Sequence, residues 1–273
     1  MRRLLDPLAR GIALPLLVLL AWEAVCALGW VNPQALPSPI AVALKWGEYL
    51  APAQARDPAS QSWLAWALSG ELLQDAQGSL GRVGVGFGVG LLLALPLGLL
   101  MGASPRLRAF TNPLIQILRP IPPIAYIPLA ILWFGLGNPP AIFLIALGAF
   151  FPILMNTIAG VSQVDGIFLR AARNLGASPM RIFIRVILPA AMPYILSGVR
   201  IGIGTAFLVV IVAEMIAVNN GLGYRILEER EYFWTDKIIA GMLSIGLIGL
   251  AIDLGMDRLN RHLLRWHRGA DAR

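Results

Sequence analysis

Few side chains in this sequence of 273 residues are placed to carry out catalysis. The two histidines, His262 and His267, stand in a basic C-terminal stretch and belong to no HExxH pair that would bind zinc. No Gly-x-Ser-x-Gly turn is present to hold a serine nucleophile. Neither lysine, Lys45 or Lys237, follows a glycine-rich loop, so the sequence has no phosphate-binding P-loop. We therefore predict no catalytic residue, no metal site and no cofactor on this chain, and we do not expect an enzyme.

The ionisable residues of greatest interest are those that interrupt long apolar runs. They are Glu23, Arg200, Glu214 and Asp253. Charge in lipid is costly, so such residues usually face protein or water. The three carboxylates would suit the proton or sodium sites of a secondary transporter driven by an ion gradient, which is the competing functional hypothesis. Arg200 is expected to attract an anion, to reach toward the interface or to pair within the bundle. Glu214 is expected to form a structural or gating hydrogen bond, and Glu23 and Asp253 to be structural.

The composition indicates which elements must position these residues. Hydrophobic residues make up 58% of the sequence and charged residues 14%, and the mean hydropathy is +0.72. A soluble domain carries about 25% charged residues. The sequence therefore predicts an all-α, polytopic membrane protein without a separate soluble domain. Apolar runs of about 20 residues, enough to cross a bilayer, predict six transmembrane helices near 11–30, 82–103, 113–135, 140–160, 194–218 and 237–256.

The distribution of Lys and Arg predicts the orientation. With the N-terminus inside, the interior segments are 1–10, 104–112, 161–193 and 257–273, and the exterior ones are 31–81 and 219–236. The interior segments hold fourteen basic residues and the exterior segments four. Cytoplasmic segments are enriched in Lys and Arg, so both termini are expected in the cytoplasm. The net charge of +7 is then explained by topology and by contact with anionic lipid, rather than by a nucleic-acid surface.

Three parts are expected along the chain. Residues 1–81 form an N-terminal transmembrane helix and an exterior segment, 82–256 form the core transmembrane domain, and 257–273 form a basic cytoplasmic tail. The first run follows basic residues, as in a signal peptide, but no small-residue cleavage site with a soluble mature sequence follows it. We expect an uncleaved helix. The lone Cys26 cannot form an internal disulfide, and a lipoprotein site there is poorly supported.

A polar island at residues 170–179 separates the fourth and fifth runs on the predicted cytoplasmic side. Apolar residues recur at helical spacing over 167–175, which predicts a short amphipathic helix. Gly176 suits the left-handed position that ends a helix. The polar side of this helix carries Arg170, Arg173 and Asn174.

A second short helix is predicted after the first. Ser178 followed by Pro179 is a helix-start signal, and Pro189 and Pro193 are expected to interrupt this helix before the fifth span. The result is a helix-turn-helix at the membrane face, which either docks a partner protein or rests on lipid. Docking is favoured because small residues permit close approach of another backbone: Ala171, Ala172 and Gly176.

This island resembles the cytoplasmic signature of permease subunits of ATP-binding-cassette (ABC) importers. That signature is Glu-Ala-Ala, three residues, Gly, nine residues, Ile, one residue, Leu-Pro. The sequence has Arg170-Ala171-Ala172, Gly176, Val186 and Leu188-Pro189 at those spacings. Val186 in place of Ile is conservative. Arg170 in place of the acidic residue puts in doubt a specific salt bridge made by the family's Glu, but not the docking itself.

The resemblance implies a type I ABC importer (MetI-like) permease fold in the bacterial inner membrane. In that family the island is a coupling helix seated in a groove of a separate ATPase subunit, which carries ATP and Mg. Two ATPase subunits, a second copy of the permease and an exterior substrate-binding protein are the implied partners, and alternating access is the implied mechanism. By this resemblance the coupling segment is 163–189, with contacts from Arg170, Ala171, Ala172, Arg173, Leu175, Gly176 and Ser178, and Pro189 fixes the return into the membrane.

Other motifs resemble one branch of these permeases. The runs at 29–39, 118–123, 133–137 and 198–202 are similar to permeases for nitrate, sulfonate, taurine and bicarbonate. The Arg-Ala-Ala start and the tail at Trp266-His267 are more similar to taurine permeases. The resemblance thus favours taurine or another alkanesulfonate, with nitrate and bicarbonate as the other substrates of the branch.

Prolines and glycines in the spans predict how the helices pack. Pro120, Pro122 and Pro123 remove backbone donors, which predicts either a bent, mobile helix lining the pathway or a static kink. The glycines at 84, 86, 88, 90, 98, 102, 198 and 202 include pairs four residues apart, which are expected to let helices pack closely rather than to move a gate.

The exterior segment 219–236 begins with Asn219-Asn220-Gly221 and continues into a Glu-rich stretch. These residues predict a turn that leads into a short amphipathic element. Two interpretations stay open, a contact with a substrate-delivering protein and a solvated loop.

Overall fold

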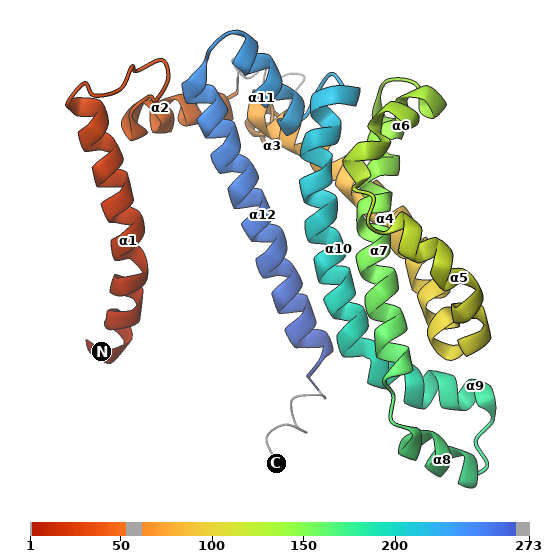
Figure 1. The fold of residues 1–273 in the computed structure, drawn as a ribbon. Coiled ribbons are helices and arrows are strands. Elements are labelled where there is room, and N and C mark those ends of the chain that lie inside the picture. The colour runs from red at the N-terminus through yellow and green to blue at the C-terminus, as the bar shows by residue number, and fades with distance from the viewer. Residues whose placement is uncertain (1, 53–61, 266–273) are drawn as a thin grey trace. The chain divides into compact units, whose positions relative to one another are not determined.

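The structure is a computed structural model that describes residues 2–52 and 62–265. Within these residues the regular elements are helices (Figure 1). One isolated antiparallel bridge pairs Pro52 with Gly70. The end of the predicted basic tail, with Trp266 and His267, lies outside the described residues. The all-helical architecture agrees with the expectation from composition.

Four helical runs among the described residues are long and apolar enough to cross a membrane. They are α4 (Glu71–Ala103), α7 (Asn138–Ser162), α12 (Thr235–Leu263) and a continuous run of 39 residues, Pro179–Ala217. The run Pro179–Ala217 consists of α9 (Pro179–Ile182), the π-helical turn η2 (Phe183–Ile187) and α10 (Leu188–Ala217). In α1 (Arg2–Ala27) the stretch Ala13–Ala27 is an apolar helix, and it belongs to the first predicted span.

The third predicted run forms two helices. α5 (Pro105–Leu118) ends before Pro120, and the 3₁₀ turn η1 (Pro123–Tyr126) leads into α6 (Ile127–Phe134). The two parts meet at an angle of 81° and together make a fifth apolar crossing or a re-entrant loop. The break follows from the prolines, because proline lacks the N–H that continues a helix and disfavours helical geometry in the residue before it.

The helices separate into two units, which are described individually. One contains Met1–Gln77 and Asn220–Gly246, and the other Gly78–Asn219 and Leu247–Arg273. In the first unit, α2 (Pro39–Leu50) starts at Ser38, whose side chain accepts a hydrogen bond from the Ala41 amide. This unit also contains α3 (Trp63–Ala67) and α11 (Leu222–Glu231).

In the second unit, α7 is the central helix, against which α10 and α4 pack. Glycines make this packing possible. A Cβ atom on Gly202 would lie 2.8 Å from Cγ1 of Ile153, and one on Gly90 would lie 2.6 Å from the Ala146 carbonyl oxygen. The predicted packing role is thus supported for Gly86, Gly90, Gly98, Gly102, Gly198 and Gly202, whereas Gly84 and Gly88 have open space beside them.

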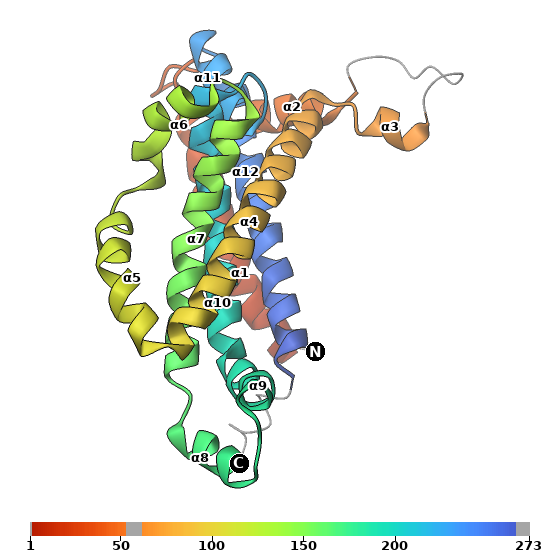
Figure 2. The same cartoon turned by 90° about the vertical axis from the view of Figure 1, so that its right-hand side faces the viewer.

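The polar island lies beyond one end of α7 and α10. The helix α8 (Gly166–Asn174) follows α7, and α9 follows α8 after a tight turn. Both views show α8 and α9 past the end of α7 (Figures 1 and 2). The segment 163–189 therefore joins two membrane-spanning helices at one end of the second unit.

Candidate functional site

The coupling segment, defined as residues 163–189, starts with α8. The Asp165 carboxylate accepts a hydrogen bond from the Ile167 amide at 2.8 Å and so caps the helix. The helix ends at Gly176, which has φ 71°. There the Gly176 amide donates to the Arg173 carbonyl, and the Ala177 amide donates to the Ala172 carbonyl. The predicted helix and its glycine stop are confirmed.

The second helix of the segment also starts as predicted. Ser178 caps α9 by accepting a hydrogen bond from the Arg181 amide, and Pro179 occupies the first turn. The expectation that Pro189 and Pro193 interrupt this helix is wrong. Pro189 lies in the first turn of α10 and Pro193 lies inside it, within one continuous run.

The π-helical turn η2 explains why the helix continues past Pro189. In this turn the Leu188 amide donates to the Phe183 carbonyl, five residues earlier. A proline in a helix lacks a donor and crowds the carbonyl four residues before it. The wider π turn loosens the helix immediately before Pro189, so the chain enters α10 without a break.

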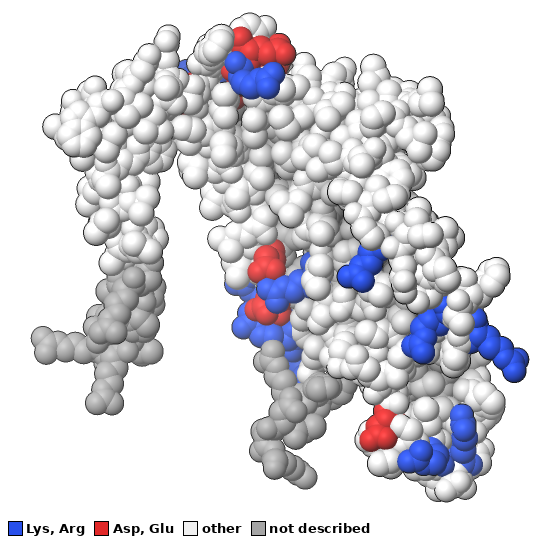
Figure 3. All heavy atoms as spheres, viewed as in Figure 1, with Lys and Arg blue, Asp and Glu red and all other residues white. Residues whose placement is uncertain are grey.

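The coupling segment exposes an apolar surface as well as charge. Leu175 at the turn is 88% exposed, and Ile167, Phe168 and Met180 are also exposed. The predicted contact residues Arg170, Ala171, Arg173, Gly176 and Ser178 are exposed, and Ala172 and Pro189 are partly buried. On the visible face, Lys and Arg side chains gather around α5 and α8 (Figure 3). Exposed apolar side chains next to basic ones are typical of a protein interface.

Arg200, in the middle of α10, forms an ion pair. Its Nε donates to Oδ1 of Asp253 at 2.9 Å and its Nη2 to Oδ2 at 2.8 Å. Asp257 lies 3.7 Å from the same guanidinium. The structure thus shows pairing within the bundle, one of the predicted alternatives, and gives Asp253 a structural partner. A paired arginine is a weak candidate for attracting an anion.

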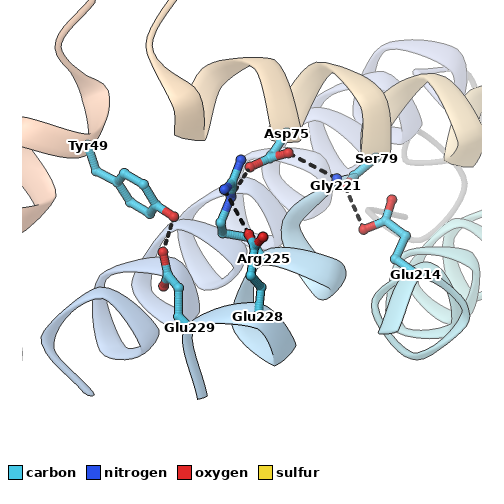
Figure 4. A network of polar contacts seen from close by, with 8 residues as sticks. All are labelled: Tyr49, Asp75, Ser79, Glu214, Gly221, Arg225, Glu228 and Glu229. Atoms are coloured by element: carbon cyan, nitrogen blue, oxygen red, sulfur yellow. Dashed lines mark hydrogen bonds and ion pairs between the residues drawn. The ribbon is translucent and has the colours of Figure 1, made fainter. Parts of the chain in front are cut away.

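Glu214, on α10, is completely buried. Its carboxylate accepts a hydrogen bond from the Ser79 hydroxyl at 2.8 Å (Figure 4) and forms an ion pair with Arg82. Arg82 also donates to the Asn138 side chain at 2.7 Å. Glu214 therefore links α10 to α4, and through Arg82 to the start of α7, which fits a structural or gating role. In the sequence, the only sign of this pairing was an arginine and a glutamate in separate apolar runs.

The predicted pathway prolines lie at the break between α5 and α6. Pro120 and Pro122 form the linker, and Pro123 starts η1. A cavity of about 500 Å³ lies beside this break, bounded by the linker, α7 and α10. Its polar lining residues are Arg119, Asn156 and Thr205.

A polar cluster in the first unit was not predicted. Asp75, at the start of α4, accepts hydrogen bonds from the Gly221 amide at 3.0 Å and from Nε of Arg225 at 2.8 Å. Arg225 also pairs with Glu228 at 2.9 Å. The Tyr49 hydroxyl donates to the buried Glu229 carboxylate, as Figure 4 shows. The segment 219–236 is therefore partly packed rather than a solvated loop.

Burial and hydrogen bonding both shift the pKa values of this cluster. Burial raises the pKa of Glu229 above its ordinary value, although the hydrogen bond from Tyr49 opposes the shift. Burial also raises the pKa of the Tyr49 hydroxyl, as does its hydrogen bond to Glu229. For Arg225, burial acts to lower the pKa, but the hydrogen bond to Asp75 and its charge outweigh it, so the pKa is raised. The only signal in the sequence was the group of opposite charges in the exterior segments.

Comparison with proteins of known structure supports the fold. The chain aligns with a chain of the inward-facing MetNI methionine ABC transporter with a TM-score of 0.62 and 22% identity, over 74% of this chain and 99% of that one. A chain of an amino acid ABC transporter aligns with a TM-score of 0.56 and 20% identity, over 71% and 92% of the two chains. The type I importer permease fold expected from the resemblance is confirmed.

Relatives of similar sequence are named as transport permeases. The taurine transport system permease protein TauC of Escherichia coli is 36% identical over 265 residues, 96% of this chain and 92% of that protein. The putative aliphatic sulfonates transport permease protein SsuC of Bacillus subtilis is 37% identical over 263 residues, covering 96% and 89%. The bicarbonate transport system permease protein CmpB of Synechococcus elongatus is 38% identical over 188 residues, covering 68% of each.

A family profile matches most of the membrane-spanning part of the chain. The match covers residues 90–269, from the middle of α4 to the tail. It includes the coupling segment, the cavity beside Arg119 and the ion pair of Arg200. Together with the relatives, it makes the chain a permease component rather than an enzyme, and an integral membrane protein. The chain belongs to the family of binding-protein-dependent transport system inner membrane components.

Proposed function

We propose that this chain is the permease subunit of an ATP-driven importer for a small anion, with taurine or another alkanesulfonate as the favoured substrate. The relatives named for taurine and aliphatic sulfonates align over 96% of this chain. The bicarbonate relative aligns over 68%. Nitrate and bicarbonate are the other candidates of the branch. The breadth of the match supports a sulfonate over these two.

The observation that carries the proposal is the construction of the coupling segment. Its two short helices expose apolar side chains at Phe168 and Leu175. Its second helix continues without a break into α10. An ATPase subunit seated on α8 and α9 would therefore move α10 together with α9, because α9 continues into the span without a break. Closure of two ATPases on ATP and Mg would drive alternating access in this way.

The proposed assembly has two copies of this chain, two ATPase subunits on the cytoplasmic side and a binding protein outside. Both termini are placed in the cytoplasm. The distribution of Lys and Arg supports this orientation, and it puts the coupling segment on the side where ATP is available. The segment 219–236 is placed outside, where a binding protein would deliver the anion.

The alternative is a secondary transporter driven by an ion gradient. Two of its candidate ion sites are occupied by other interactions, since Glu214 is bound by Arg82 and Ser79, and Asp253 by Arg200. A paired carboxylate is a poor site for a transported proton or sodium ion. The pairing therefore favours the importer.

Uptake in proteoliposomes tests the proposal. The chain is reconstituted with the ATPase encoded beside it and with candidate binding proteins, and labelled taurine, an alkanesulfonate, nitrate and bicarbonate are offered outside. We expect uptake that requires both ATP and a binding protein. Uptake that continues without ATP and collapses with an ion gradient would refute the importer.

A further inference from the structure

The cavity beside the break between α5 and α6 lies midway along the spanning helices. Its α7 residues fall between Leu147 and Asn156, in a helix that runs from 138 to 162. Its α10 residues fall between Ile201 and Val209, in a helix that runs from 188 to 217. Arg119 is reached after the 14 residues of α5, about 20 Å along that helix. The cavity is thus far from both ends of the spans.

Arg119 brings a positive charge to this depth, and the part of the chain that the structure describes places no carboxylate in an ion pair with it. Residues 76–164 and 166–213 contain no Asp or Glu, so the segments that line the cavity carry no carboxylate. An ionisable residue in the middle of a membrane protein is costly to keep and usually serves a function. Arg200, by contrast, is neutralised by Asp253.

The lining of the cavity suits a small polar ligand. Most lining side chains are apolar, and a few polar groups converge on the same space. Asn156 is one of them, and its side-chain amide donates one N–H to the Pro152 carbonyl at 2.8 Å and has a second N–H. Thr205 is another, and its hydroxyl donates to backbone carbonyl oxygens of α7 and α10. A volume of about 500 Å³ lies within the range of about 300–1,000 Å³ that is typical of ligand pockets.

We propose that Arg119 is the anion contact of the translocation pathway, where its guanidinium binds the oxyanion group of the substrate in the cavity shared with Asn156 and Thr205. The planar guanidinium offers several N–H donors, which match the oxygens of a sulfonate or a similar oxyanion. This inference rests on the proposed import of a small anion and assigns the contact inside the membrane. The break at Pro120 and Pro122 places Arg119 at a helix end, where it is exposed and lines the cavity.

Transport by the complete complex tests this assignment. Arg119→Gln and Arg119→Lys are reconstituted with the ATPase and the binding protein, and three quantities are measured: recovery of the complex, ATP hydrolysis stimulated by the binding protein, and initial uptake of labelled taurine. We expect Arg119→Gln to keep complex recovery and ATP hydrolysis within about twofold of wild type and to lose at least about tenfold in uptake. Arg119→Lys keeps the charge and should transport at an intermediate rate.

Arg258→Gln, on α12, is the control, because it removes an exposed arginine that does not line the cavity. It should transport like wild type. The assignment is overturned if Arg119→Gln transports within about twofold of wild type, or if the control loses as much uptake. Loss of complex recovery in both Arg119 variants would also overturn it, since a packing role would then explain the arginine. Failure of the proposed function is separate: the wild-type complex would then show no ATP-dependent anion uptake.

Discussion

Arg82 and Glu214 form an ion pair that is almost completely shielded from solvent, with 6% and 0% of their side chains exposed. The pair connects α4 to α10, and Ser79 adds a hydrogen bond to the same carboxylate. Removing one member of a buried pair leaves the other charge without its main partner. That loss typically costs about 3–5 kcal/mol, whereas replacing both members with apolar residues is often nearly neutral.

We therefore expect Arg82→Met and Glu214→Met each to lower the thermal unfolding temperature of the purified chain in detergent. The double variant should lie closer to wild type than either single variant. Arg200→Met is the control, because its ion pair is less buried than that of Arg82, so the unfolding temperature should fall less. Equal losses in Arg82→Met and Arg200→Met would contradict the importance of burial.

A second prediction concerns two glycines on α4 that differ only in what lies beside them. A Cβ on Gly90 would come 2.6 Å from the Ala146 carbonyl oxygen on α7, whereas a Cβ on Gly88 would meet nothing within 4 Å. Gly90→Ala should therefore force α4 away from α7 and lower the unfolding temperature. Gly88→Ala should be neutral or stabilising by up to about 1 kcal/mol, because alanine favours the helix. The measurement compares the thermal unfolding temperatures of the two variants. Equal destabilisation would show that α4 and α7 do not pack as described.

The glycines also show how far the sequence could predict the fold. Pairs four residues apart indicated close helix packing, but residues 84 and 88 have the same spacing as 86 and 90. The spacing of the glycines does not show which face of α4 packs against α7, because that face is determined by the tertiary packing of the two helices. Features that depend on neighbouring residues alone were predictable, namely the apolar runs of α4, α7, α10 and α12, the end of α8 at Gly176 and the cap at Ser178.

Two features could not be predicted from the sequence: the continuous helix at Pro189 and the ion-pair partner of Arg82. A proline usually ends a helix, but the helical run continues past Pro189 through a π turn, and no local pattern predicts that turn. Arg82 and Glu214 are 132 residues apart along the chain, and no local pattern pairs them. Arg119 could be noticed in the sequence as a charge in an apolar run, but the cavity that it lines could not.

A third prediction tests the docking surface on the coupling segment. Gly176→Glu puts a side chain and a negative charge at the turn between α8 and α9, where the backbone is left-handed and the space is open. It should abolish association with the ATPase subunit while membrane insertion is retained. Copurification of the two subunits measures the first effect, and the amount of permease in the membrane fraction measures the second.

Gly29→Glu is the matched control for this variant. Gly29 has φ 68°, close to the 71° of Gly176, and also has nothing within 4 Å of the position of a Cβ. The two substitutions therefore impose the same backbone strain at two different places. Normal recovery of the ATPase with Gly176→Glu would show that the docking surface lies elsewhere. Loss of the ATPase with Gly29→Glu as well would mean that strain, and not the position, is responsible.

A last prediction follows from the Tyr49 hydroxyl, which donates to the buried Glu229 carboxylate. Burial raises the pKa of Glu229 above its ordinary value near 4.5, and the nearby charges of Lys237 and Arg225 limit the shift. A carboxyl with a raised folded-state pKa stabilises the fold below its ordinary pKa, and this contribution is lost as the pH rises through the raised value.

Tyr49→Phe removes a donor from the ionised carboxylate, which should cost about 1–3 kcal/mol at neutral pH and raise the pKa of Glu229 further. The loss should shrink as the pH falls toward 4.5, because the protonated carboxyl is less costly to bury without that donor. Thermal unfolding of Tyr49→Phe and wild type between pH 4.5 and 8 measures the difference; a loss that is constant across this range would show that Glu229 does not titrate in it.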